Sequence, residues 1–122
     1  MSSYRHLRME WINDVLVARI VDARLSDTMW VTEFQDELLL LVDREKPKKV
    51  LVSFHGVTHC STAVINGLLR AKKKLMTSGG GQIKLSDMHA PMREAYKLLN
   101  LDGTVFHIHD SEAEALAAFG YV

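Results

Sequence analysis

Apolar residues follow two patterns along this chain: short continuous runs that are typical of buried strands, and the spacing that is typical of one face of a helix. These patterns predict the strands and helices described below. Residues 50–54, VLVSF, form a short apolar run that predicts a buried strand. A turn follows at Gly56, and the polar residues 60–62 then open a helix that the glycines 79–81 end. The apolar face of this helix is expected to consist of Ile65, Leu68, Leu69, Leu75 and Met76. Any function is expected at the loop of hydroxyl residues between strand and helix.

The N-terminal part predicts a hairpin followed by a helix. Residues 7–20 contain two strand-like runs that are separated by a tight turn at residues 13–14. Residues 24–27 are interpreted as a connector, within which Ser26 or Asp27 caps a helix running to about residue 44. The buried face of that helix is expected to consist of Val31, Phe34, Leu38, Leu41 and Val42.

The C-terminal part predicts two more strands and two more helices. Residues 82–85 and 105–108 read as short strands, and Pro91 is placed at the first position of a third helix. Tyr96, Leu98 and Leu99 are expected to supply the apolar surface of the third helix, and Asp110 or Ser111 to cap the last one. Strands that alternate with helices indicate a mostly parallel sheet. We therefore expect one α/β domain over residues 1–122, with an N-terminal β-hairpin, a central sheet and about four helices.

The amino-acid composition and the balance of charges argue against several classes of protein. The chain has 122 residues, 48% of them hydrophobic, and its 15 basic residues balance its 15 acidic ones. This balance argues against direct nucleic-acid binding, and no apolar run is long enough for a bilayer. The N-terminus lacks the apolar core of a signal peptide, and the single cysteine suits a reducing compartment. We expect a cytoplasmic protein that binds neither nucleic acid nor membrane.

The order of several short motifs resembles the STAS domain, the fold of anti-sigma-factor antagonists and stressosome proteins. The turn GVTH at residues 56–59 and the helix LLRA at 68–71, with its terminal glycines, are similar to the family's turn and central helix. PMRE at 91–94 is similar to the start of the family's next helix, and residues 105–116 look like its last strand and helix. The resemblance covers nearly the whole chain.

The same register aligns two hydroxyl residues with the family's switch site. Thr62 falls on the Ser or Thr that the family phosphorylates, and Ser61 falls on the Asp before it. The run Thr62-Ala63-Val64 looks like the threonine version found in stressosome scaffold proteins, with Val64 in place of a glycine. Serine cannot supply the missing carboxylate, so three alternatives stay open. Thr62 is the acceptor, Ser61 is itself the acceptor, or the protein acts without phosphorylation.

The resemblance implies a regulatory protein-interaction module. Its partner would be an anti-sigma factor with a serine/threonine protein kinase fold, and a serine phosphatase would reset the switch. The expected binding surface is Thr58, His59, Cys60, Ser61, Thr62, Ala63 and Val64. The alternative is a stressosome-like scaffold, or a small-ligand-binding STAS subunit without a phosphoswitch. A homodimer is also left open.

The residues themselves allow two interpretations of Thr62. A hydroxyl near a helix start commonly does no more than cap the helix. A phosphate there would meet free backbone N–H groups and the positive end of the helix dipole, so the fold would tolerate it. Cys60 is interpreted as a buried thiol in preference to a reactive one.

No enzyme is expected, because the sequence contains no recognisable nucleophile–base pair or carboxylate pair. His107 and His109 lie on one side of a predicted strand, and His55 and His59 lie near the end of another. Zinc sites usually need three or four converging ligands, and these pairs lack the accompanying carboxylates or thiolates. Neither a metal nor another cofactor is expected.

Overall fold

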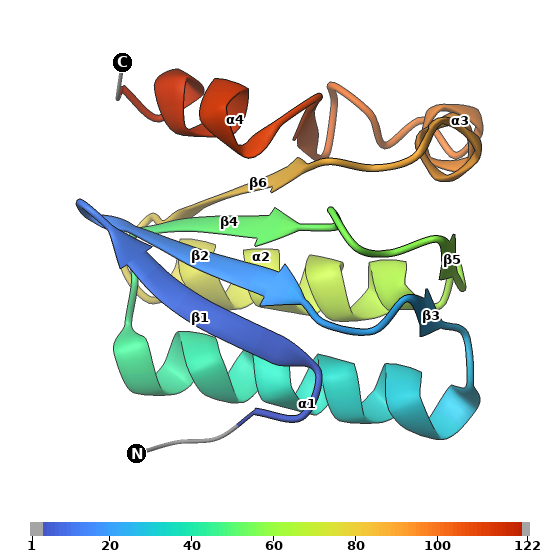
Figure 1. The fold of residues 1–122 in the computed structure, drawn as a ribbon. Coiled ribbons are helices and arrows are strands. Elements are labelled where there is room, and N and C mark those ends of the chain that lie inside the picture. The colour runs from blue at the N-terminus through green and yellow to red at the C-terminus, as the bar shows by residue number, and fades with distance from the viewer. Residues whose placement is uncertain (1–3, 121–122) are drawn as a thin grey trace.

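A computed structural model describes residues 4–120 as a sheet with helices on both sides (Figure 1). In chain order, the elements are β1 (Leu7–Ile12), β2 (Val15–Ile20), β3 (Arg24–Leu25), α1 (Thr28–Glu45), β4 (Lys49–Ser53), β5 (His59–Cys60), α2 (Val64–Thr77), β6 (Gln82–Ser86), α3 (Ala90–Leu98), β7 (His107–His109) and α4 (Glu112–Ala118). The main sheet has the strand order β1-β2-β4-β6-β7. Only β1 runs antiparallel to its neighbour, and the other pairs are parallel. The predicted fold class is confirmed.

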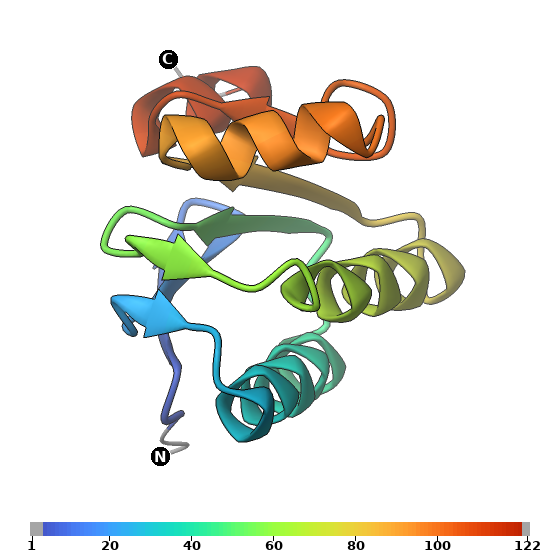
Figure 2. The same cartoon turned by 90° about the vertical axis from the view of Figure 1, so that its right-hand side faces the viewer.

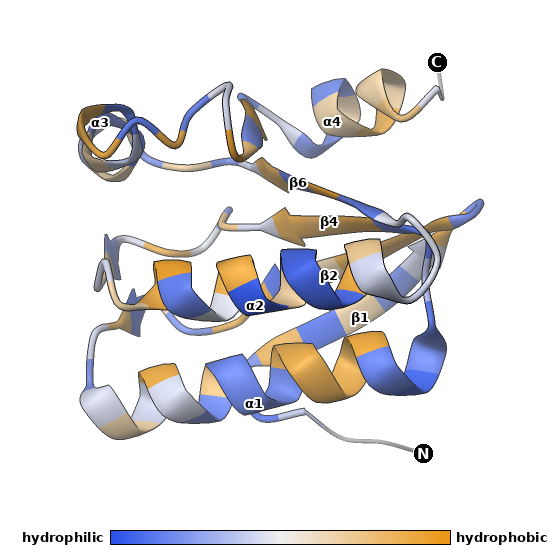
Figure 3. Ribbon diagram, turned by 180° about the vertical axis from the view of Figure 1, so that it is seen from behind, coloured by the Kyte–Doolittle hydropathy of each residue, from blue (hydrophilic) through white to orange (hydrophobic). Residues whose placement is uncertain are grey.

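The strands β2 and β4 are buried on both faces, which explains their unbroken apolar runs. Val50 and Val52 contact the larger core beneath α1 and α2, whereas Leu51 contacts a smaller core beneath α4. Figure 3 shows the difference in hydropathy: β2 and β4 are mostly orange, while α1 and α2 change from orange to blue around their axes. The strand predicted over residues 50–54 therefore occupies the middle of the sheet.

Several local predictions are confirmed by backbone conformation, capping hydrogen bonds and burial. Asn13 adopts a left-handed conformation, with φ of 55°, at the hairpin turn. Asp27 caps α1 by accepting hydrogen bonds from the backbone N–H groups of Met29 and Trp30. Ser111 caps α4 by accepting from the N–H of Glu114. The five positions proposed for the buried face of α1 are all buried.

The predicted connector at residues 24–27 is the first correction. It contains β3, which pairs in parallel with β5 (Figure 2). Cys60 consequently lies in a strand and does not open the helix, and α2 begins only at Val64. A ladder two residues long between segments far apart in sequence leaves no periodicity for a pattern to reveal.

The exposed leucines are the second correction. Leu68 is fully buried, but Leu69 is 37% exposed and Met76 is 58% exposed. Adjacent helical positions point about 100° apart, and only one side of α2 faces the sheet and α1. In α3 only Tyr96 is buried, and the expected apolar residues Leu98 and Leu99 face outward.

The remaining differences concern element bounds. Pro91 occupies the second position of α3, and the last strand is shifted to His107–His109. No helix formed by the described residues is long and apolar enough to cross a membrane.

Candidate functional site

Residues 58–64, called the loop below, contain the short strand β5 and end at the first residue of α2. The core holds both ends of this segment. Val57 before it and Val64 at its end are both buried. Between them, the backbone N–H groups of Thr58 and His59 donate to the carbonyl oxygen of Ala23, at 2.8 and 3.1 Å. The Thr58 hydroxyl donates to the same oxygen at 3.0 Å. These contacts fix the loop against β3, so that its tip presents a defined shape.

Ser61 and Thr62 have different roles at this tip. Ser61 Oγ accepts a hydrogen bond from the N–H of Ala63 at 3.1 Å, and its own N–H donates to Leu25 O. Thr62 is exposed, and its hydroxyl makes no hydrogen bond within residues 4–120. The local turn is therefore stabilised by Ser61, and the hydroxyl of Thr62 is left accessible.

Most backbone N–H groups near Thr62 already have hydrogen-bond partners, contrary to our expectation that they would be free. The N–H groups of Val64, Ile65 and Asn66 donate to the carbonyl oxygens of Ser61, Thr62 and Ala63 in turn, at 3.0–3.1 Å. These hydrogen bonds form the turn that leads into α2, and they use three of the donors that a phosphate was expected to meet. The positive end of the helix dipole still lies close to Thr62.

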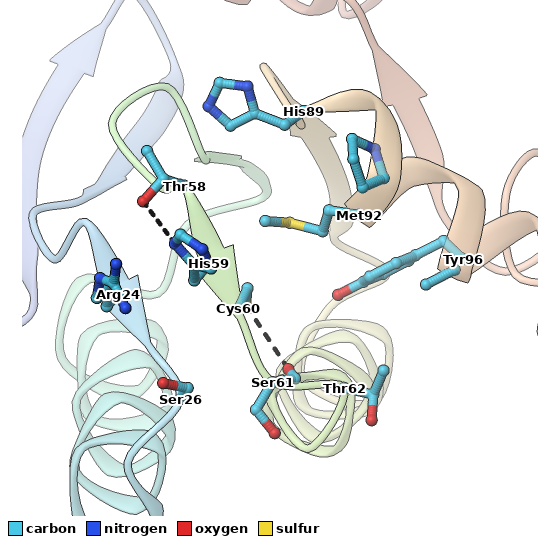
Figure 4. Close-up of a pocket in the computed structure, with 12 residues that line it drawn as sticks. Arg24, Ser26, Thr58, His59, Cys60, Ser61, Thr62, His89, Met92 and Tyr96 are labelled. Carbon is cyan, nitrogen blue, oxygen red and sulfur yellow. Dashed lines mark hydrogen bonds between the residues drawn. The ribbon is translucent and has the colours of Figure 1, made fainter.

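A cavity of about 440 Å³ lies between the loop and α3 (Figure 4). Its lining residues are Arg24, Ser26, Thr58, His59, Cys60, Ser61, Thr62, His89, Pro91, Met92, Ala95 and Tyr96. Five of the seven residues predicted for partner binding thus share one cavity wall. The other two lie elsewhere: Ala63 lines a separate groove beside α1, and Val64 is buried in the core.

Two neutral groups lie at the inner end of this cavity. Burial raises the pKa of the Cys60 thiol to about 12, so it is uncharged at neutral pH and is a poor nucleophile. Burial, with a smaller effect from Cys60, also raises the pKa of the Tyr96 hydroxyl. Cys60 is half-buried and not fully buried as we interpreted it, while its raised pKa agrees with an unreactive thiol.

Sequence reasoning missed the residues that complete the cavity. Arg24 and Ser26 come from the unrecognised strand β3 and the residues after it. Met92 and Tyr96 come from α3, and His89 immediately precedes this helix. No local motif links these segments to the loop, because the sheet topology brings them together. The proline before α3 predicted a helix start but gave no indication of what this helix would face.

Histidines and acidic residues do not converge on a metal site in the described part of the chain. No group of three His, Cys, Asp or Glu side chains within residues 4–120 could hold a metal ion.

The family model of the STAS domain matches residues 8–115. The chain belongs to the STAS domain family. STAS domains are typically regulatory modules without catalytic activity. No curated protein has a significant sequence match to this chain.

Solved structures with the same fold have low sequence identity to this STAS domain. An anti-sigma-factor antagonist (STAS) domain protein from Planctomyces limnophilus is 23% identical, with a TM-score of 0.82 over 94% of this chain and 98% of its own. SpoIIAA from Bacillus, in the phosphorylated form, is 14% identical, with a TM-score of 0.67 over 93% and 98%. A variant of RsbS from Moorella thermoacetica is 16% identical, with a TM-score of 0.68 over 92% of both chains. At these identities the likeness establishes the fold alone.

Proposed function

We propose that this STAS domain is a cytoplasmic regulatory module that binds an anti-sigma factor of the serine/threonine protein kinase type through residues 58–64. One observation carries the proposal: the free hydroxyl of Thr62 is presented at the tip of a loop that the core anchors on both sides. An anchored loop loses little conformational entropy on binding. The fold shared with anti-sigma factor antagonists supports this choice of partner class.

Exposed apolar side chains at the start of α1 extend the proposed surface. Met29 is 66% exposed and Trp30 is 39% exposed. The same end of α1 also borders a groove of about 210 Å³, whose lining residues are Ser26, Thr28, Val31, Thr32, Gln35, Ser61, Ala63 and Asn66. Large apolar residues beside a polar loop are typical of a protein interface, in which aromatic anchors contribute much of the affinity.

Phosphorylation of Thr62 would act on this surface through charge. A phosphate adds about two negative charges at neutral pH. Burying them against a partner would require their desolvation, so binding would weaken. A serine phosphatase would restore the binding form. Ser61 provides no carboxylate beside the acceptor, and kinase recognition would depend on the shape of the loop.

The proposal is tested by capture from the native cell, phosphosite mapping, and affinity measurements with the captured kinase. Thr62→Glu should weaken binding at least tenfold, whereas Thr62→Ala should bind like the parent. Ser61→Asp should increase the rate of phosphorylation of Thr62 if a carboxylate assists the kinase. Ala117→Glu, which adds the same single negative charge at an exposed site on α4, is the matched control. Equal affinities of the parent and Thr62→Glu for the kinase would exclude a phosphorylation switch at Thr62. If no substitution in residues 58–64 changed the affinity, these residues would be excluded as the binding surface.

Self-association, as a homodimer or a stressosome-like scaffold, is the second candidate function. Leu98 and Leu99 at the end of α3 are 80% and 53% exposed, and neither lines the cavity beside the loop. Light scattering of the parent and of Leu98→Glu tests this candidate. A concentration-dependent dimer that the substitution dissociates would support it, and a monomer at all concentrations would exclude it.

A further inference from the structure

We propose that the cavity between β5 and α3 binds a small organic anion, with its apolar body against Met92 and Tyr96 and its charged group near Arg24. A carboxylate and a phosphate ester would satisfy the same contacts. The inference does not require a protein partner, because every residue that it uses belongs to this chain.

Tyr96 is the first observation that indicates a ligand. Its side chain is 98% buried, and its hydroxyl has no hydrogen-bond partner within the described residues. Figure 4 shows this hydroxyl directed into the cavity toward Cys60. Buried hydroxyl groups in proteins nearly always have a partner, since an unpaired one destabilises the fold. An oxygen atom of a ligand would supply the missing partner.

The walls of the cavity indicate that the ligand has an apolar body. Pro91, Met92 and Ala95 contribute apolar surface from α3, and the ring of Tyr96 packs against Phe106 at a centroid distance of 6.4 Å. A volume of about 440 Å³ lies within the range of small-molecule sites, and a few polar groups on a mainly apolar wall are typical of them. A bicyclic aromatic acid is of suitable size.

The charges around the cavity indicate that the ligand is an anion. No aspartate or glutamate lines it, whereas Arg24, His59 and His89 do. Arg24 forms no ion pair with any carboxylate in residues 4–120, so its guanidinium group is available. Guanidinium groups bind carboxylates and phosphates through paired hydrogen bonds.

The cavity shares residues 58–62 with the proposed partner surface. If the proposed function holds, a ligand here would change partner affinity, and the partner would change ligand affinity by the same factor. This consequence rests on the proposed function, but the existence of the ligand site does not.

The test is a titration of the isolated full chain with 6-hydroxynaphthalene-2-carboxylate, followed by ¹H–¹⁵N NMR spectra; its carboxylate can lie near Arg24 while its hydroxyl oxygen meets Tyr96. The uncharged analogue, in which a hydroxymethyl group replaces the carboxylate, and inorganic phosphate are titrated in parallel; this analogue is called the alcohol below. The carboxylate should give saturable shifts for amides in residues 58–62 and 89–96. Its Kd should be roughly fivefold lower than that of the alcohol, the effect expected of a charge-assisted hydrogen bond.

Three variants identify the contacts. Arg24→Gln should raise the Kd of the carboxylate roughly fivefold and leave that of the alcohol unchanged, whereas Arg8→Gln, at an exposed arginine of β1, should change neither. Tyr96→Phe keeps the ring and should weaken both ligands. Because Tyr96 is buried, thermal unfolding is measured to establish that this variant folds. If it does not fold, the comparison of the two arginine variants decides.

Three results would overturn the proposal. The first is the absence of saturable shifts at the cavity with the carboxylate at millimolar concentrations. The second is an equal loss of affinity in Arg24→Gln and Arg8→Gln. The third is equally tight binding of inorganic phosphate, which would show that the apolar body is not recognised. None of these results involves a partner protein, so failure here leaves the proposed partner surface standing.

Discussion

The buried imidazole of His6 lies 2.5 Å, from Nδ1 to Oδ2, from the carboxylate of Asp22. Its other nitrogen, Nε2, lies 2.9 Å from Glu33 Oε1, and its backbone N–H donates to Glu37. Arg5 also contacts Glu33, so the described charged groups at this site are three carboxylates and one guanidinium. The two ring nitrogens both face acceptors, which favours the doubly protonated imidazolium. The hydrogen bonds to Glu33 and Glu37 hold His6, the residue before β1, against α1.

The His6 cluster should make stability depend on pH. Burial lowers the pKa of His6, but hydrogen bonds to Glu33 and Asp22 outweigh it and raise the pKa above 6.5. The stabilisation is therefore complete below the unfolded pKa, near 6.5, and is lost as the pH rises through the folded value. Urea midpoints measured at increasing pH should fall in this window for the parent, and His6→Asn should abolish the fall.

The control for this prediction is His55→Asn, because His55 is 84% exposed and its contact with Asp87 is long. It should retain the fall in midpoint that the parent shows. The pKa of His109 is lowered by burial, so this residue also contributes to the pH dependence of stability. The difference in urea midpoint between the parent and each variant cancels that contribution. A parent whose midpoints are flat from pH 6.5 upward would show that the imidazolium is not stabilised in the fold.

Two adjacent leucines of α2 should differ sharply in their contribution to stability. Leu68 is fully buried, and its truncation leaves a cavity, so Leu68→Ala should cost about 2–5 kcal/mol of unfolding free energy. Leu69 is 37% exposed, so Leu69→Ala should cost less than about 1 kcal/mol. Chemical denaturation of both variants measures the difference. Equal losses would mean that the helix is rotated about its axis relative to the structure described here.

The sequence predicted the features that depend on periodicity. The buried face of α1, from Val31 to Val42, follows directly from helical spacing, and β4 follows from its unbroken run of apolar residues. Asp27 and Ser111 were predictable as caps because the chemistry of capping is local. Because strands and helices alternate, and parallel strands are joined by right-handed crossovers, only a few sheet topologies are compatible with these elements.

The features that depend on long-range contacts could not be predicted in this way. The pairing of Arg24 with His59 joins segments 35 residues apart through a ladder of only two residue pairs. The approach of Tyr96 to Cys60 depends on how α3 crosses the end of the sheet, which no motif encodes. The loop residues were therefore predictable as a segment, but the cavity beside them was not.

Acid should weaken the contact between β2 and α4. The Arg19 guanidinium group binds both carboxylate oxygens of Glu112, at 3.0 and 2.9 Å, and lowers the pKa of Glu112 below 4.5. This stabilisation is present above the unfolded pKa and is lost as the pH falls through the folded value. Glu112→Gln should cost about 1–2 kcal/mol at neutral pH and less in acid. Glu94→Gln, at an exposed residue of α3, is the control. A loss in Glu112→Gln that does not change with pH would contradict an ionic contact.

The two hydroxyls at the loop tip should separate into one that stabilises the fold and one that does not. Ser61 Oγ accepts the hydrogen bond from the N–H of Ala63, so Ser61→Ala should lower the unfolding free energy by about 1 kcal/mol, the net contribution of a typical hydrogen bond. Thr62 is exposed and its hydroxyl is unpaired within residues 4–120, so Thr62→Val, which preserves its shape, should leave stability within about 0.5 kcal/mol of the parent. Denaturant unfolding of both variants at one pH measures the difference. If Thr62→Val proves the more destabilising of the two, Thr62 supports the turn, and its hydroxyl is not free to accept a phosphate without cost to the fold.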